Sequence, residues 1–76
     1  MSLKVFSVNH EVRFRRIVAA ERAGDAARLL GCSLGFLNRR GTVCTVPEDV
    51  AVAMSAPGVV FQRRLSLGGE WERMVA

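Results

Sequence analysis

The chain has 76 residues, half of them apolar, and a formal net charge of +4. This length predicts a single domain over residues 1–76, and the apolar content excludes wholesale disorder. No apolar run approaches the roughly 18 residues of a membrane helix, so we expect no membrane partner. A core this small would gain stability from a second copy of the chain, which makes a homodimer one expectation.

Residues 3–20 predict extended structure, because apolar side chains alternate along them. Among them, Phe6, Val8, Val12 and Phe14 share one parity. We predict a hairpin that turns at Asn9-His10-Glu11, pairs Val8 with Val12 and pairs Phe6 with Phe14. Arg13 and Arg15 would then share the other face. One long, bent strand is the alternative interpretation.

Two short helices are predicted next. The apolar stripe of the first, within residues 21–30, consists of Ala23, Ala26, Ala27 and Leu30. Gly31 is placed to end this helix in a left-handed cap. Ser33 is placed to cap a second helix, from Leu34 to about Arg39, that stops at Gly41.

The second half of the chain adds one helix and one or two strands. Residues 42–46 are either a short strand or an extended link. Pro47-Glu48-Asp49 predicts the start of a third helix, whose acids complement the helix dipole and which ends at Pro57-Gly58. Its expected buried residues are Val50, Ala53 and Met54. Residues 59–65 predict a strand, and Gly68-Gly69 predicts a turn into a return strand over residues 70–74.

This order of elements predicts an α+β fold. The N-terminal hairpin and the C-terminal strand or strands would form a small antiparallel sheet, packed against two or three short helices. Phe36, Phe61 and Trp71 are expected to belong to its core.

The residues indicate no catalytic or cofactor chemistry. His10, Cys32 and Cys44 are one residue short of the four ligands of structural zinc, and no phosphate-binding glycine motif occurs. We therefore expect a non-enzymatic protein without metal or cofactor. Because Met1-Ser2-Leu3-Lys4 leads directly into a strand-like pattern, we expect no signal peptide, a cytoplasmic location and reduced cysteines.

Basic charge is uneven along the chain. Residues 1–40 carry eight basic and three acidic groups, whereas residues 41–76 carry three basic and four acidic groups. Ten of the eleven cations are Arg, which binds carboxylates and phosphates in a bidentate manner. The candidate partner-binding residues are Arg13, Arg15, Arg39, Arg40, Arg63 and Arg64, on a sheet face and at a helix end. A solvated basic surface is the alternative interpretation.

Residues 25–41, DAARLLGCSLGFLNRRG, resemble a helix-turn-helix. Ala27, Gly31 and Leu37 stand where that motif has a small residue, a turn glycine and a buried apolar residue, whereas Arg40 departs from it. The resemblance implies DNA contacts from Ser33, Leu34, Asn38, Arg39 and Arg40. An ordinary helical pair packed on a sheet is the alternative.

A second resemblance covers about residues 12–63. The stretches RRIVAAERAGDAARLLGCSLGFLNRR and PEDVAVAMSAPGVVFQR are similar to small proteins of bacteria, phages and mobile elements. In size and strand-helix make-up the chain also resembles anti-CRISPR proteins. That resemblance implies steric inhibition of a nucleic-acid-handling complex, such as a type I CRISPR-Cas complex. The leading hypothesis is therefore an interaction protein with Cas proteins as partners, and the alternative is a small DNA-binding transcriptional regulator.

Overall fold

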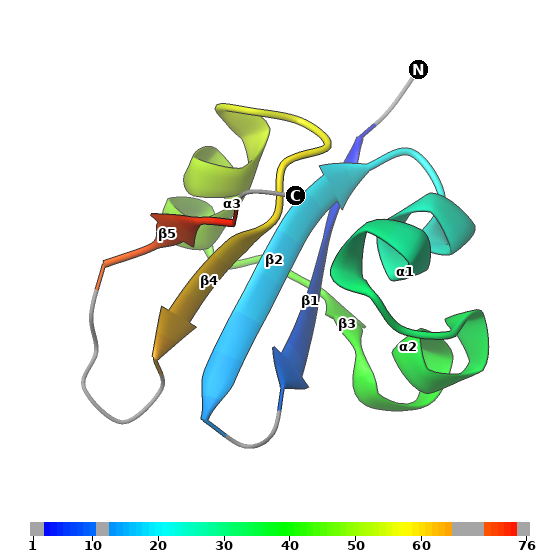
Figure 1. The fold of residues 1–76 in the computed structure, drawn as a ribbon. Coiled ribbons are helices and arrows are strands. Elements are labelled where there is room, and N and C mark those ends of the chain that lie inside the picture. The colour runs from blue at the N-terminus through cyan, green and yellow to red at the C-terminus, as the bar shows by residue number, and fades with distance from the viewer. Residues whose placement is uncertain (1–2, 11–12, 65–69, 75–76) are drawn as a thin grey trace.

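The computed structural model describes residues 3–10, 13–64 and 70–74. Five strands form one antiparallel sheet in the order β3-β1-β2-β4-β5 (Figure 1). The strands are β1 Lys4–His10, β2 Phe14–Ala20, β3 Thr42–Val43, β4 Phe61–Arg64 and β5 Glu72–Arg73. The helices are α1 Ala23–Leu30, α2 Leu34–Arg40 and α3 Pro47–Met54. The predicted α+β fold is confirmed, and none of these three helices has the length and apolarity to cross a membrane.

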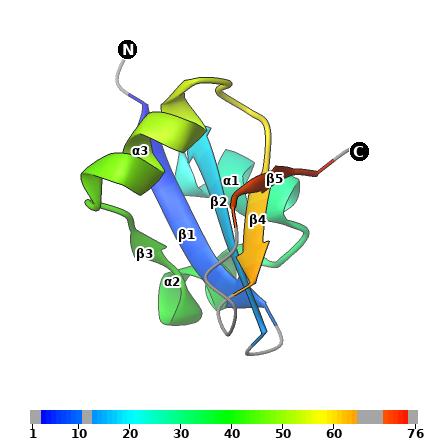
Figure 2. The ribbon, with the colours of Figure 1, turned by 90° about the vertical axis from the view of Figure 1, so that its left-hand side faces the viewer.

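Helices cover both faces of the sheet. Even-numbered residues of β1 and β2, such as Phe6 and Val18, pack against α1 and α2. Odd-numbered residues, such as Val5 and Ile17, pack against α3 on the opposite face. Figure 2 shows α3 and α1 on opposite sides of the sheet. Because both faces carry a core, alternation along β1 and β2 separates two buried faces rather than a buried face from a wet one.

The predicted hairpin pairs the right segments in the wrong register. The structure pairs Phe6 with Val18 and Val8 with Arg16, and β2 begins only at Phe14. The predicted turn at Asn9-His10-Glu11 is therefore wrong, because β1 continues to His10. The longer strands form seven residue pairs, which satisfy more backbone hydrogen bonds than the shorter predicted hairpin. Val12 lies outside the described residues.

The two helix caps around the predicted turn are confirmed. Gly31 follows α1 with a φ of 75°, and the hydroxyl of Ser33 accepts a hydrogen bond from the Phe36 N–H at 3.1 Å. Phe36 itself is 38% exposed, so its expected place in the core is wrong. Leu37 is the residue of α2 that meets the sheet, and its neighbour Phe36 is turned about 100° away around the helix.

The third helix differs from its prediction in its buried face and its end. Asp49 and Ala53 are its buried residues, whereas Met54 is 36% exposed. Asp49 and Ala53 are four residues apart and so share one face, and Met54 lies about 100° from Ala53. The helix ends at Met54, before the predicted Pro57-Gly58 stop.

The C-terminal strands agree with the sequence in outline. The segment 42–46 contains β3, which pairs with β1 at one edge of the sheet. The predicted return strand is present as β5, which pairs with β4 at the other edge. Phe61 is buried and Trp71 is partly buried against the α3 side of the sheet. The predicted Gly68-Gly69 turn lies outside the described residues.

Alanine substitutions at two glycines of the α2 region are expected to change the free energy of unfolding in opposite directions. A Cβ at Gly41 would lie 2.7 Å from the Leu37 carbonyl oxygen and 3.2 Å from that of Ser7, whereas a Cβ at Gly35 meets nothing within 4 Å. We expect Gly41→Ala to lower the free energy of unfolding by about 1–3 kcal/mol through overpacking. Gly35→Ala should raise it by about 0.5–1 kcal/mol through helix propensity. Urea denaturation of both variants measures the difference, and equal values would contradict the close approach at Gly41.

Candidate functional site

Arg15 and Arg63 stand directly opposite each other on neighbouring strands. β2 and β4 are paired so that these two residues are partners in the register. Both lie on the sheet face that packs against α3, because they share the parity of Ile17 and Phe61. The Nε atom of each guanidinium is buried and has no hydrogen-bond partner. The Arg15 side chain is 32% exposed, so its exposure comes from other atoms than Nε.

Asp49 ties this part of the sheet to α3. Its side chain is only 6% exposed, and its Oδ2 lies 3.9 Å from the Arg15 Nη1. The Trp71 indole N–H donates to Oδ1 at 3.2 Å, and the Cys44 thiol lies 4.0 Å from Oδ2. Asp49 is also in the first turn of α3, where the helix dipole favours a negative charge. One carboxylate therefore links β2, α3 and the segment that carries β5.

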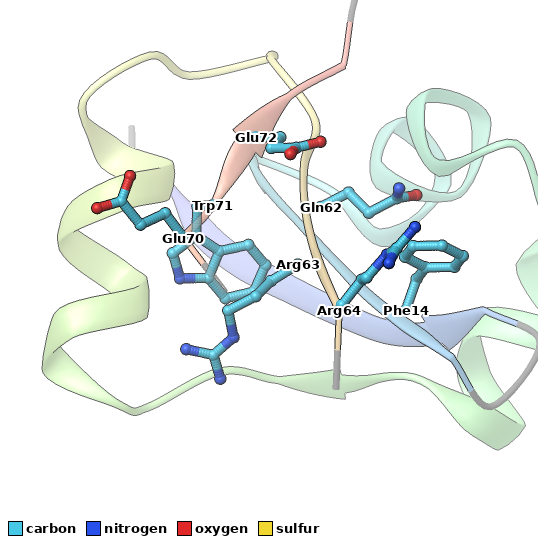
Figure 3. A pocket seen from close by; sticks show the side chains of 7 residues that line it. All are labelled: Phe14, Gln62, Arg63, Arg64, Glu70, Trp71 and Glu72. Atoms are coloured by element: carbon cyan, nitrogen blue, oxygen red, sulfur yellow. The ribbon is translucent and has the colours of Figure 1, made fainter. Parts of the chain in front are cut away.

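Two arginines of β4 stack on aromatic rings. The Arg63 Cζ lies 4.9 Å from the centroid of the Trp71 ring, and the Arg64 Cζ lies 5.9 Å from that of Phe14. Figure 3 shows the two pairs on opposite sides of β4. A guanidinium stacked by its face keeps its N–H edge available for a carboxylate or phosphate. Stacking therefore restricts both cations and leaves the outer N–H groups of each guanidinium free to bind.

A pocket of about 570 Å³ surrounds these stacks (Figure 3). Its lining residues are Phe14, Gln62, Arg63, Arg64, Glu70, Trp71 and Glu72. The lining thus combines two cations, two acids, one amide and two aromatic rings. Such a combination can recognise a mixed polar and apolar surface through salt bridges, hydrogen bonds and stacking.

The six predicted partner-binding arginines do not form one surface. Arg15 and Arg63 lie together on the α3 face of β2 and β4, whereas Arg64 lies on the opposite side of β4 (Figure 3). Arg13 is exposed in the residue before β2 begins. Arg39 and Arg40 lie at the end of α2, which packs on α1 and β1. Since β2 separates β1 from β4 in the sheet, these two arginines belong to a different region.

Some residues of the stretch that resembles a helix-turn-helix are buried or exposed as that motif requires. Ala27 and Leu37 are buried, as the resemblance implies. The five residues predicted to contact DNA are all exposed: Ser33, Leu34, Asn38, Arg39 and Arg40. The Arg39 Nε donates to the Gly35 carbonyl at 3.3 Å, which directs this side chain along the helix.

Sequence reasoning missed the structural role of Asp49 and its contact with Trp71. It interpreted Asp49 only as an acid at a helix start. One signal was present: Asp49 precedes the buried Ala53 by four residues, which places both on the same helix face. A second signal was the single Trp, whose indole N–H needs an acceptor when it packs in a core.

Cys32 and Cys44 are free thiols, and no three metal-ligating side chains gather in the described part of the chain. Burial raises the pKa of the Cys32 thiol. A raised pKa means less thiolate at a given pH, and the thiolate is the reactive form. We therefore expect Cys32 to react with a disulfide reagent more slowly than free cysteine at pH 8, with the difference narrowing as the pH rises. A Cys44→Ala variant isolates this rate, and a rate equal to that of free cysteine would contradict the expectation.

Comparison with known proteins adds no relative. No protein-family model, no curated protein and no solved structure matches this chain. The case for a function therefore depends on the surface formed by β2, β4 and β5 and on the α1–α2 unit.

Proposed function

We propose that this chain is a non-enzymatic interaction protein that binds a protein surface of mixed polar and apolar character through the stacked arginines of β4. The observation that carries the proposal is the pair of stacks, Arg63 on Trp71 and Arg64 on Phe14, at one pocket. Trp and Arg dominate the binding energy of many protein interfaces. Side chains already held by stacking lose less conformational freedom on binding, which favours affinity.

The same pocket favours a protein over a nucleic acid. Glu70 and Glu72 line it beside the arginines, and their charges repel a chain of phosphates. Binding of single-stranded nucleic acid also uses free aromatic faces on which bases stack. Here guanidinium groups already lie over the rings of Trp71 and Phe14.

The resemblance to anti-CRISPR proteins supplies the class of partner for this proposal. The chain would bind a type I CRISPR-Cas complex in the cytoplasm and block the place where target DNA or a Cas subunit must bind. Inhibition of this kind is steric, so it needs a stable surface and no cofactor.

A plasmid-interference assay tests the proposed function. Bacteria with an active type I system are transformed with a targeted plasmid while they express this protein. We expect transformation to rise towards the level of an untargeted plasmid, and the Arg63→Glu variant to abolish the rise. Unchanged interference across type I systems, with the protein folded and expressed, would contradict the proposal.

A second candidate is a small DNA-binding regulator. It is favoured by the Ser33-capped α2, which exposes Asn38 and Arg39 while Leu37 is buried. A gel shift at two salt concentrations with a scrambled competitor tests it. A regulator predicts sequence-dependent binding that Asn38→Ala weakens and that falls with salt at a log–log slope of about −0.9 per phosphate contact. The interaction proposal predicts no sequence-dependent shift.

A further inference from the structure

We propose that Arg15 and Arg63 together bind one side-chain carboxylate of the partner protein. This inference rests on the proposed function only in taking the partner to be a protein. The site itself is defined by the register of β2 and β4, which places the two guanidinium groups opposite each other beside α3.

Arg15 and Arg63 together carry more positive charge than the acid beside them neutralises. Like charges directly opposite each other on neighbouring strands are destabilising. Among the described residues, the counter-charge is Asp49, whose Oδ2 lies 3.9 Å from the Arg15 Nη1. This distance exceeds the roughly 2.7–2.9 Å of a charge-assisted hydrogen bond. Within contact distance of the pair, two guanidinium groups and the Asp49 carboxylate leave a formal charge of +1, which one further carboxylate neutralises.

The guanidinium groups of Arg15 and Arg63 present their outer nitrogens to a ligand. The Nε atoms of Arg15 and Arg63 are buried, so a ligand that arrives from solvent meets the outer nitrogens of each guanidinium first. The Trp71 ring lies against Arg63 on this face, and the Trp71 N–H is engaged by Asp49. The two cations are therefore positioned before a ligand arrives. Buried donors without an acceptor are rare in native proteins, and such local costs are typical of functional sites.

A single carboxylate suits this site better than a chain of phosphates. A nucleic acid brings further phosphates on either side of the one that is bound. Glu70 lines the pocket that Arg63 also lines, and its charge would repel those phosphates, whereas Glu72 pairs with Gln62 and lies on the opposite face of the sheet from Arg63. A single Asp or Glu side chain on a protein surface brings one negative charge and avoids this repulsion.

NMR titration with sodium acetate tests the site directly. Burial slows the exchange of the Arg15 and Arg63 Nε–H protons with water, which favours their observation. At constant ionic strength set by chloride, we expect acetate to shift both resonances along one saturating curve. Arg63→Gln should abolish the shift at Arg15, and Arg63→Lys should weaken binding about tenfold because it loses the planar fork. Arg40→Gln, a change of the same type on α2, should leave the titration unchanged.

Two outcomes would overturn the assignment. If acetate shifts neither resonance, or shifts the exposed arginines equally, the pair is not a carboxylate site. If a single-stranded oligonucleotide displaces acetate and binds the pair more tightly per charge, the ligand is a phosphate. The interference assay tests the proposed function separately from this site. Acetate binding without inhibition would support the carboxylate site and contradict the proposed partner. Inhibition without acetate binding would support the proposed partner and contradict the carboxylate site.

Discussion

Replacing Asp49 by Ala is expected to lower the free energy of unfolding by about 2–3 kcal/mol. The change leaves the Trp71 indole N–H without its acceptor and removes the charge beside Arg15. Because the Arg15 side chain is about one-third exposed, its share of the loss is reduced by solvent screening. Urea denaturation followed by circular dichroism measures the change.

Glu48 provides the matched control for this prediction. It is the preceding acid in the same first turn of α3, and it is exposed, whereas Asp49 is buried. Glu48→Ala should change the free energy of unfolding by no more than about 0.5 kcal/mol. Equal effects of the two substitutions would show that Asp49 acts only through the helix dipole and not through Trp71 and Arg15.

Replacing Arg63 by Glu is expected to weaken partner binding at least about a hundredfold. The change removes the stack on Trp71 and places a negative charge beside Glu70 in the same pocket. The free energy of unfolding should fall by about 1 kcal/mol or less, because Arg63 is only partly buried. Calorimetry with the complex identified by the interference assay measures the affinity.

Arg22→Glu is the control for this second prediction, because it makes the same change in net charge on an exposed residue at the start of α1. It should change the affinity by less than about threefold if the stacked arginines are the binding site. A similar loss in both variants would mean that total charge, and not the surface on β4, controls binding.

Local rules predicted the first two helices well. The spacing of Ala26, Ala27 and Leu30, the left-handed Gly31 and the Ser33 cap depend only on neighbours in the sequence. The hairpin register was not predictable in this way. Moving from the predicted to the observed pairing keeps every residue on its face, so apolar alternation is the same in both registers.

The site was predictable only in its composition. The sequence indicated that Arg63 and Arg64 lie on a possible neighbouring strand, but the strand register decides that Arg63 faces Arg15 while Arg64 stacks on Phe14. Arg39 and Arg40 lie in a different region from these residues, because α2 packs on α1 and β1. Such separations depend on the order of strands in the sheet, which charge patterning does not encode.

The interference assay with two variants side by side, Arg63→Glu on β4 and Arg39→Glu on α2, tests directly whether the binding surface lies on β4. The two carry the same change in charge and lie in different regions of the fold. We expect Arg63→Glu to abolish inhibition and Arg39→Glu to retain it. If Arg39→Glu loses inhibition and Arg63→Glu retains it, the binding surface is not on β4 and the function lies in the α1–α2 unit.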